Sequence, residues 1–195
     1  MIAIASCAPR PVSIGLVFDN EWRLNAATLT TEEQTALKTT ALRALQQAFH
    51  GFDVTVREGR SADRLVIVDT GYVAGLRQRG QPAPVGETLP FARASYVHFD
   101  EMFQTLLAVV GCADLAGCRT SREEMIEALG RGIGATAAHE LGHQVGFNFA
   151  VDAICDACYD GRTSRTDEHF FGSLHWSDAA LSTMRRVLPP DVGAH

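Results

Sequence analysis

Apolar and polar residues alternate with two different periods along the first quarter of the chain, and each period predicts its own kind of element. Residues 12–18 (VSIGLVF) are a short apolar run rich in β-branched side chains, which predicts a buried strand. Residues 31–49 carry apolar side chains every three or four positions, which predicts an amphipathic helix. Thr30 and Glu33 have the spacing of a capping box, so we expect this helix to begin at Thr30 or the next residue.

Three further strands and a long connection are predicted after this helix. The strands fall near residues 53–57, 65–69 and 94–99, and the last of them (ASYVHF) is expected to be an edge strand. Residues 71–93 contain several glycines, prolines and arginines, so we expect an exposed loop there. A short helix is predicted over residues 100–110.

Two overlapping capping-box spacings, at Thr120 and Ser121, predict the start of another helix. Three glycines follow, at positions 130, 132 and 134. Each glycine costs about 1 kcal/mol in the interior of a helix. We therefore expect a break in this region and a separate helix over residues 136–145.

The C-terminal part is predicted to be mostly irregular and to end in one helix. Gly146 suits the left-handed conformation that closes a helix. Residues 148–175 show no sustained period. Ser177 or Asp178 is expected to cap a last helix that runs to Val187.

Composition favours one ordinary globular domain. The chain has 195 residues, of which 46% are hydrophobic and 21% charged, and no apolar run reaches the roughly 20 residues that span a bilayer. We expect an N-terminal tail at residues 1–11 and a single monomeric α/β (α+β) domain at residues 12–195. The net charge of -6 argues against nucleic acid as a partner.

The cysteines indicate an oxidising compartment. Cys112 lies near Cys118, and Cys155 and Cys158 form a CxxC, so two local disulfides are expected and the location is predicted to be extracellular or periplasmic. The tetrapeptide that ends at Cys7 resembles the lipobox of bacterial lipoproteins. The residues before it lack the basic and apolar regions of a signal peptide, so a lipid anchor through Cys7 is the less favoured alternative.

The most specific chemical signal is the sequence His139-Glu140-x-x-His143. Positions i and i+4 lie on the same face of a helix, so the two imidazoles can bind one ion. Glu140 follows the first histidine, where it can act as a general base toward an activated water. The motif therefore predicts a catalytic zinc site.

Residues 138–147 (AHELGHQVGF) resemble the active-site helix of the metzincin clan of zinc endopeptidases, particularly its matrixin-like members. The predicted order of elements is also similar to that clan: strand, helix, strands, edge strand, active-site helix and a short C-terminal part with a final helix. The resemblance implies a metzincin-like domain with a mixed twisted sheet and Zn2+ as cofactor. It also implies a peptide or protein substrate, extended along the strand near residues 94–99.

The clan's motif, HExxHxxGxxH, matches this chain except at its last position. The four matching residues are His139, Glu140, His143 and Gly146. Phe149 stands where the clan has its third zinc-binding histidine. Residues 157–160 (ACYD) resemble the clan's methionine turn beneath the zinc, with Cys158 in place of the methionine.

A third zinc ligand must therefore come from elsewhere, because catalytic zinc sites normally use three protein ligands and a water. Asp152 is the nearest carboxylate after the motif, and some members of the clan use aspartate as third ligand at the position that Phe149 occupies here. The further candidates are Asp156, Glu168 and His169.

Two other functions compete with a zinc endopeptidase. The two histidines of the motif could join Cys155 and Cys158 in a closed structural zinc site, which has no open position for water. Alternatively, the loss of the histidine at Phe149 could leave a degenerate metzincin-like domain that binds peptides without cleaving them. We favour the enzyme, because Glu140 and Gly146 would have no purpose in a closed site.

Overall fold

The computed structural model of the chain describes most of the residues between positions 10 and 191. The described ranges are 10–19, 23–24, 27–69, 84–88, 92–114, 117–146, 155, 157–161 and 166–191. Four residues singled out from the sequence lie outside them, namely Cys7, Phe149, Asp152 and Asp156.

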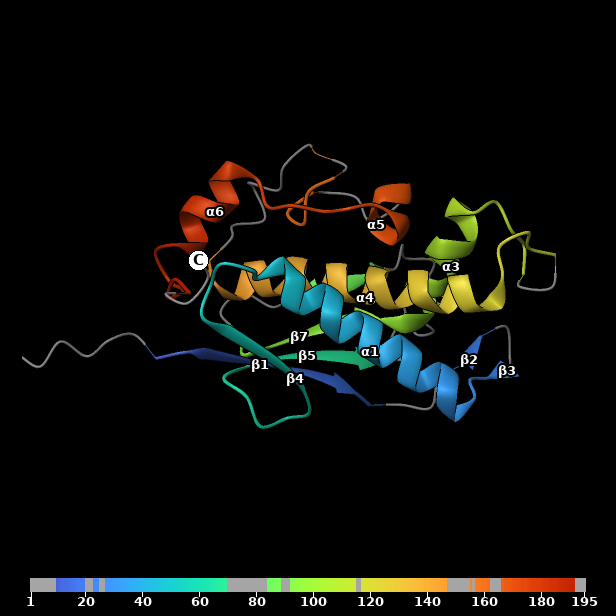
Figure 1. The fold of residues 1–195 in the computed structure, drawn as a ribbon, viewed down its shortest axis with the longest axis horizontal. Helices are drawn as coiled ribbons and strands as arrows, with labels where there is room; N and C mark the ends of the chain where they lie inside the picture. Colours follow the sequence, from blue (N-terminus) through green and yellow to red (C-terminus); the bar gives the residue numbers. More distant parts are fainter. Residues whose placement is uncertain are drawn as a thin grey trace, which may run out of the picture.

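Within these ranges the fold is a mixed α/β arrangement with a five-stranded sheet, a two-stranded sheet and five helices (Figure 1). The strands are β1 (Val12–Phe18), β2 (Arg23–Leu24), β3 (Ala27–Thr28), β4 (Val54–Glu58), β5 (Arg64–Asp69), β6 (Gly86–Thr88) and β7 (Ala94–His98). The helices are α1 (Thr31–Ala48), α3 (Phe99–Val109), α4 (Arg122–Gln144), α5 (Asp167–Phe171) and α6 (Asp178–Met184).

The main sheet is mixed, as predicted, and its strands lie in the order β4-β1-β5-β7-β6. β1 runs parallel to both β4 and β5, and β5 runs parallel to β7. β6 alone runs antiparallel to its neighbour, with Gly86 opposite Val97 and Thr88 opposite Ser95. One edge of the sheet is therefore a short antiparallel strand.

The prediction that residues 94–99 form an edge strand was wrong. β7 pairs with β5 on one side and with β6 on the other, and Phe99 already belongs to α3. The true edge, β6, lies inside the segment that was expected to be an exposed loop. Its three residues, one of them glycine, are too few to produce a recognisable alternation of apolar and polar positions.

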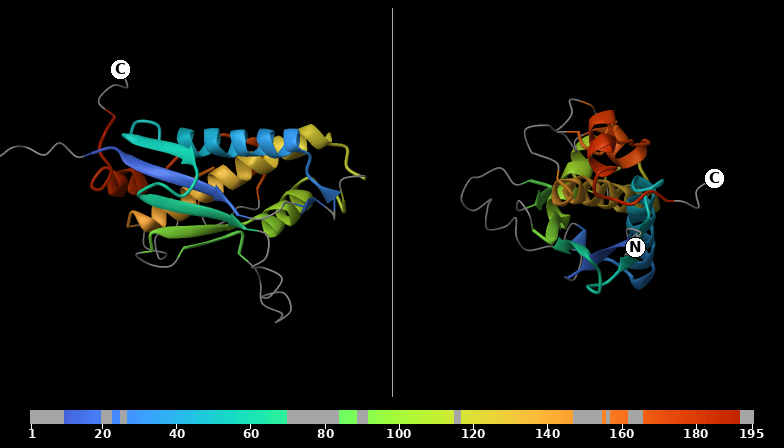
Figure 2. Two further views of the ribbon diagram at one scale, coloured as in Figure 1. Left: turned by 90° about the horizontal axis from the view of Figure 1, so that it is seen from below. Right: turned by 90° about the vertical axis from the view of Figure 1, so that its left-hand side faces the viewer.

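Helices α1 and α4 cover the same face of the sheet, and α4 lies between the sheet and the C-terminal segment that carries α5 and α6 (Figures 1 and 2). Apolar side chains fill the space between sheet and helices. Fully buried examples are Leu16, Val66 and Val97 from the strands, Leu37 and Leu45 from α1, and Leu129 and Ile133 from α4. Because α4 is the middle layer, it is buried along nearly its whole length.

The expected break among the three glycines was also wrong, since α4 is one continuous helix of 23 residues. The glycines lie in its interior because neighbouring elements approach too closely for a side chain. A Cβ at Gly130 would come within 2.8 Å of the backbone oxygen of Leu37, and one at Gly134 within 2.6 Å of that of Ala41. At Gly132 a Cβ would meet the ring of Phe170 at 2.5 Å. Close packing therefore outweighs the low helix propensity of glycine.

Both long helices begin where the sequence predicts. Thr30 and Glu33 form the capping box of α1, and Ser121 and Glu124 form that of α4. An ion pair between Glu33 and Arg122 joins these two N-terminal ends, and the hydrogen bond from Arg122 lowers the pKa of Glu33. The two helices are thus aligned from their first turns.

Other boundaries differ from the predictions by a few residues. The sequence favours Asp100 as the cap of the third helix, but α3 is capped by His98, two residues earlier, and begins at Phe99. Ser177 caps α6 as predicted, but this helix ends at Met184 and not at Val187. The short helix α5 lies in the segment that was expected to be irregular.

Both predicted disulfides are present, between Cys112 and Cys118 and between Cys155 and Cys158. Two disulfides in a chain of this size are typical of an oxidising, extracellular environment. In the part of the chain that the structure describes, no helix is both long and apolar enough to cross a bilayer.

Replacement of Gly134 by alanine tests the contact between α1 and α4. The added methyl group would have to push against the backbone of α1, so we expect Gly134→Ala to lower the free energy of unfolding by roughly 1–3 kcal/mol, although alanine favours helix by about 1 kcal/mol. Urea unfolding measures the difference. Glu127→Ala, at an exposed position of the same helix, is the control and should stay within about 0.5 kcal/mol of the wild type. A stabilised Gly134→Ala variant would contradict the packing argument.

Candidate active site

His139 and His143 lie one turn apart near the C-terminal end of α4, and their side chains converge. The two Nε2 atoms are 3.0 Å apart, and the ring planes are nearly perpendicular, at 84°. His143 is buried and His139 is half-buried. The structure therefore brings together the two side chains that the sequence predicts as metal ligands.

The backbone oxygen of Tyr159 fixes the orientation of the first of these rings. It lies 2.8 Å from Nδ1 of His139. A carbonyl oxygen can only accept, so Nδ1 carries the proton and donates it, and Nε2 of the neutral ring keeps its lone pair. Histidines that bind metals usually donate their other N–H group to a carbonyl or a carboxylate in this way.

The spacing of the two Nε2 atoms fits a shared cation. Two nitrogens that are each about 2.0–2.1 Å from a tetrahedral zinc ion lie roughly 3.3 Å apart. At the 3.0 Å seen here the two atoms are within hydrogen-bond distance, so that an N–H of His143 donates to the lone pair of His139, and a cation would take the place of that proton. The spacing of His139 and His143 is therefore close to that of two ligands of one metal ion.

Among the described residues, no other histidine, cysteine or carboxylate joins these two histidines to make a group of three. Two of the candidates for the third ligand, Glu168 and His169, lie in other surroundings. Glu168 is exposed on α5. His169 is buried, with its Nε2 atom 3.0 Å from Oγ1 of Thr136 and 3.2 Å from the backbone oxygen of Gly132.

The remaining candidates for a third ligand are outside the described residues. Both Asp152 and Asp156 lie there, as does Phe149, the residue at which the sequence departs from the HExxHxxGxxH pattern. The assignment of Asp152 as third ligand therefore stays a prediction.

Glu140 is buried against the edge strand β6. Oγ1 of Thr88 lies 2.5 Å from Oε2 of Glu140 and 3.0 Å from its backbone oxygen. Gly86 gives the carboxylate room, because a Cβ at that position would come within 2.5 Å of Oε1. The candidate general base is thus held next to the antiparallel edge of the sheet.

A chain of side-chain hydrogen bonds runs through the sheet to Glu140. Gln144, one turn further along α4, donates from Nε2 to Oγ of Ser95 at 2.6 Å and to the backbone oxygen of Leu65 at 3.0 Å. Oγ of Ser95 lies 2.7 Å from Oγ1 of Thr88. Because Thr88 has a single O–H group and Glu140 can only accept, Thr88 donates to Glu140, and the hydroxyl of Ser95, which accepts from Gln144, is free to turn its own O–H toward Thr88. Bonds that all point toward a carboxylate reinforce one another and fix its orientation.

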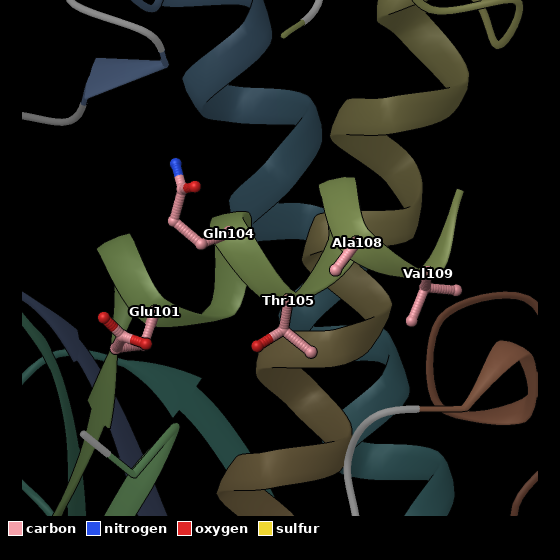
Figure 3. Close-up of a pocket in the computed structure, with 5 residues that line it drawn as sticks. All are labelled: Glu101, Gln104, Thr105, Ala108 and Val109. Carbon is pink, nitrogen blue, oxygen red and sulfur yellow. The ribbon is translucent and has the colours of Figure 1, made fainter. Parts of the chain in front are cut away.

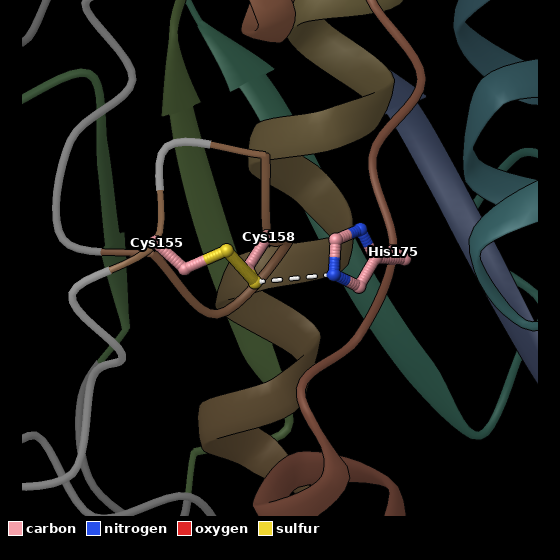
Figure 4. A group of neighbouring side chains, drawn as sticks. All are labelled: Cys155, Cys158 and His175. Atoms are coloured by element: carbon pink, nitrogen blue, oxygen red, sulfur yellow. Dashed lines mark hydrogen bonds between the residues drawn. A yellow bond between two sulfur atoms is a disulfide. The ribbon is translucent and has the colours of Figure 1, made fainter.

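A second group of metal-binding residue types lies in the C-terminal segment. Ligand atoms of Cys155, Cys158 and His175 are all within 4.8 Å of one another, and Sγ of Cys158 is 3.7 Å from Nε2 of His175 (Figure 4). This group could hold a metal, but the two cysteines are joined in a disulfide, and thiolates are the form that binds metals. The two cysteines of the CxxC thus lie next to His175. The histidines of α4, His139 and His143, are not part of this group.

The turn around Cys158 also anchors the candidate site to α1. Cys158 is buried, so it packs beneath the chain turn that contains it. The ring of Tyr159, the next residue, packs against Trp176, with 5.1 Å between the centroids, and Nε1 of Trp176 donates to the backbone oxygen of Ala48 at 2.6 Å. The carbonyl group that orients His139 therefore belongs to a segment fixed by packing.

Two pockets are lined by neither histidine of the pair. A pocket of about 320 Å³ is lined by one face of α3, through Glu101, Gln104, Thr105, Ala108 and Val109 (Figure 3). Another, of about 350 Å³, lies between α1, α4 and the segment before α6, where Arg43, Arg131 and His169 are among its lining residues. Neither includes a residue of the HExxH motif.

Several residues of the site could not be found from the sequence. Thr88 and Ser95 come to Glu140 only through the pairing of β6 with β7, and a lone hydroxyl in a short strand carries no spacing signal. His175 is 17 residues from Cys158 and joins it through a backbone bridge. Gln144 immediately follows the second histidine, but its partners lie on the sheet.

Comparison with known proteins adds little to this geometry. No family model and no curated protein matches the sequence. One solved structure with some similarity is described as the GM1 bound form of the ECX AB5 holotoxin. A chain of that structure superposes on this one with a TM-score of 0.36 and 17% sequence identity. The match covers 72% of this chain and spans 54% of the length of that one. A TM-score this low supports no conclusion about family or function.

His169 predicts part of the response of the fold to pH. Burial lowers the pKa of His169 to about 4, against the opposing effect of its hydrogen bond to Gly132 and with a smaller lowering by His139. In the unfolded chain this histidine has an ordinary pKa near 6.5. As the pH falls, it therefore binds a proton in the unfolded chain at a higher pH than in the folded protein. The contribution of neutral His169 to the free energy of unfolding is therefore complete above about pH 6.5 and is lost as the pH falls toward 4.

We expect the difference in unfolding free energy between the wild type and His169→Gln to shrink by roughly 3 kcal/mol between pH 7 and pH 4. Urea unfolding of both proteins across this range measures it, and the subtraction removes the effect of the carboxylates. His50→Gln, at an exposed histidine, serves as the control. A difference that is constant with pH would mean that His169 is not held neutral by burial.

Proposed function

We propose that this chain is a zinc-dependent endopeptidase of the metzincin type. The observation that carries the proposal is the convergence of His139 and His143, with 3.0 Å between their Nε2 atoms, on the helix that also holds Glu140 against a sheet edge. A pair of surface histidines would need neither a buried glutamate between them nor a carbonyl that fixes one ring. These features together favour a catalytic centre.

The order and pairing of elements also favour the metzincin type. A strand, a helix, further parallel strands and an antiparallel edge strand come before the long helix with the histidines, and a short part ending in a helix comes after it. The turn with Cys158 and Tyr159 contacts the first histidine, which is the place of the methionine turn in that clan. The cysteine keeps the buried position but is tied to Cys155.

Each residue of the site has a defined task in peptide hydrolysis. His139 and His143, with a third ligand that we predict to be Asp152, would hold zinc, which supplies Lewis acidity toward water and the scissile carbonyl. The backbone oxygen of Tyr159 keeps Nε2 of His139 available by accepting a hydrogen bond from Nδ1–H. Glu140 accepts a proton from the attacking water and passes it to the leaving amine, while Thr88 fixes its carboxylate.

The substrate we propose is an extended peptide or protein segment that adds to the outer edge of β6. An exposed strand edge offers backbone donors and acceptors that pair with an extended chain. Among the strands that the structure describes, β6 pairs with β7 alone, and Thr88 on this strand contacts Glu140. A peptide bound there would pass close to the general base.

Zinc content tests the metal site directly. After dialysis against a weak chelator, we expect the purified protein to keep about one zinc ion per chain, and His139→Ala to keep almost none, because only two protein ligands would remain. His50→Ala, which removes an exposed histidine, is the matched control. Asp152→Asn should weaken zinc binding by about tenfold or more if Asp152 is the third ligand. Folded wild-type protein without zinc would contradict the proposal and favour a peptide-binding domain without catalysis.

Replacement of the general base separates catalysis from metal binding. Glu140→Gln is expected to keep the fold and the zinc but to lower kcat/KM for peptide cleavage by roughly 10²–10⁴, because the amide cannot accept the proton from water. Cleavage of a mixture of peptides followed by mass spectrometry measures the loss. Glu127→Gln makes the same chemical change at an exposed position of α4 and should retain activity. Equal turnover in the Glu140→Gln variant would exclude the mechanism.

A further inference from the structure

Cys155, Cys158 and His175 are residue types that bind metals, and they lie close together. The two cysteines are oxidised to a disulfide, so the group cannot bind a metal through thiolates in this state. Two sulfurs and one imidazole nitrogen are a common set of zinc ligands. The distance of 3.7 Å from Sγ of Cys158 to Nε2 of His175 is close to the roughly 3.6 Å that separates sulfur and nitrogen ligands of one tetrahedral zinc ion. Only the disulfide between the two cysteines prevents them from acting as thiolates.

We propose that Cys155, Cys158 and His175 form a second metal site, which binds zinc or a similar thiophilic divalent cation only after the disulfide has been reduced. Thiolate ligands select such cations over magnesium and calcium. In an oxidising compartment the site stays closed, and a reducing environment opens it. The cation then replaces the covalent link that holds the turn together.

The exposure of the three residues favours reduction by a dithiol. Cys155 is half-buried and His175 is exposed, whereas Cys158 is buried. One thiolate of the reductant attacks Sγ of Cys155, the bond between the two sulfurs breaks, and Cys158 leaves as a thiolate beside the imidazole of His175. The second thiol of the reductant then attacks the mixed disulfide and releases Cys155. The dithiol has lost two electrons to the protein disulfide, and a divalent cation that binds displaces the protons of the two thiols.

Backbone contacts hold the three ligands in place whatever the state of the disulfide. The nitrogen of Tyr159 donates to the oxygen of His175 at 2.8 Å, and the nitrogen of His175 donates to the oxygen of Ala157 at 3.1 Å. A Cβ on Gly161 would lie 2.3 Å from the backbone oxygen of Cys155, so glycine is required where the turn folds back. The nitrogen of Cys158 also donates to the oxygen of Cys155 at 3.3 Å. None of these bonds involves sulfur, so reduction of the disulfide breaks none of them directly.

The other disulfide provides an internal comparison. Cys112 and Cys118 also form a local pair, six residues apart. In the described part of the chain, no histidine or carboxylate completes a group of three with them. Their reduction gives two thiols without a third ligand, and so a much weaker site.

Cobalt binding tests the proposal independently of any peptidase activity. The 195-residue chain carrying His139→Ala and His143→Ala, which lacks the histidine pair of α4, is reduced with a phosphine and titrated with Co2+ without oxygen. We expect one Co2+ per chain and the near-ultraviolet absorption that a thiolate-to-cobalt bond produces, and neither in the oxidised protein. Because histidine and carboxylate ligands do not give this absorption, failure of the zinc peptidase proposal would leave the result unaffected.

Matched variants identify the ligands. Adding Cys112→Ser and Cys118→Ser should leave the absorption unchanged, whereas adding Cys155→Ser and Cys158→Ser should remove it. His175→Ala should weaken Co2+ binding by more than about tenfold. Far-ultraviolet circular dichroism establishes that each reduced variant is folded. Absence of the absorption from the folded reduced protein, or its persistence without Cys155 and Cys158, would overturn the proposal.

Discussion

The close contact between α1 and α4 is the constraint on which the rest of the structure depends. Gly130 and Gly134 present a face of α4 without side chains, and the backbone of α1 occupies the space. The two helices therefore cover one face of the sheet as a single layer, and α4 extends without interruption from its cap at Ser121 to Gln144. Because the HExxH residues are on the last two turns of this helix, their position relative to the sheet is set by packing that lies more than a turn away.

Two elements from opposite sides hold the end of α4. The sheet provides Thr88, which bonds to both the side chain and the backbone of Glu140. The C-terminal segment provides the carbonyl group of Tyr159, which bonds to His139. Adjacent residues of one helix are thus fixed by segments about 70 positions apart in the sequence, and each side chain has a set orientation. Such preorganisation is what allows a polar site to work without first rearranging.

Much of the fold could be read from the sequence where local rules decide the outcome. The strand at Val12–Phe18 and the caps at Thr30 and Ser121 follow from hydrophobicity and capping chemistry, and the pairing of His139 with His143 follows from helical periodicity. Local rules failed where tertiary contacts decide. The glycines of α4 predict a break in the helix when the sequence is considered alone. They are required because the backbone of α1 packs against them, which the sequence does not reveal. The edge strand β6 and the partnership of His175 with the CxxC depend on chain segments meeting in space, which no spacing in the sequence records.

The continuity of α4 ties its glycines to its histidines by a fixed number of residues. Gly130, Gly132 and Gly134 precede His139 on one unbroken helix. Insertion of a single residue between the two sets would rotate the histidines by about 100° relative to α1, away from Thr88 and Tyr159. The combined pattern GxGxG-x4-HExxH is therefore a longer and more selective signature than HExxH alone. In a search of uncharacterised sequences it would separate chains built in this way from those in which the five-residue motif occurs by chance.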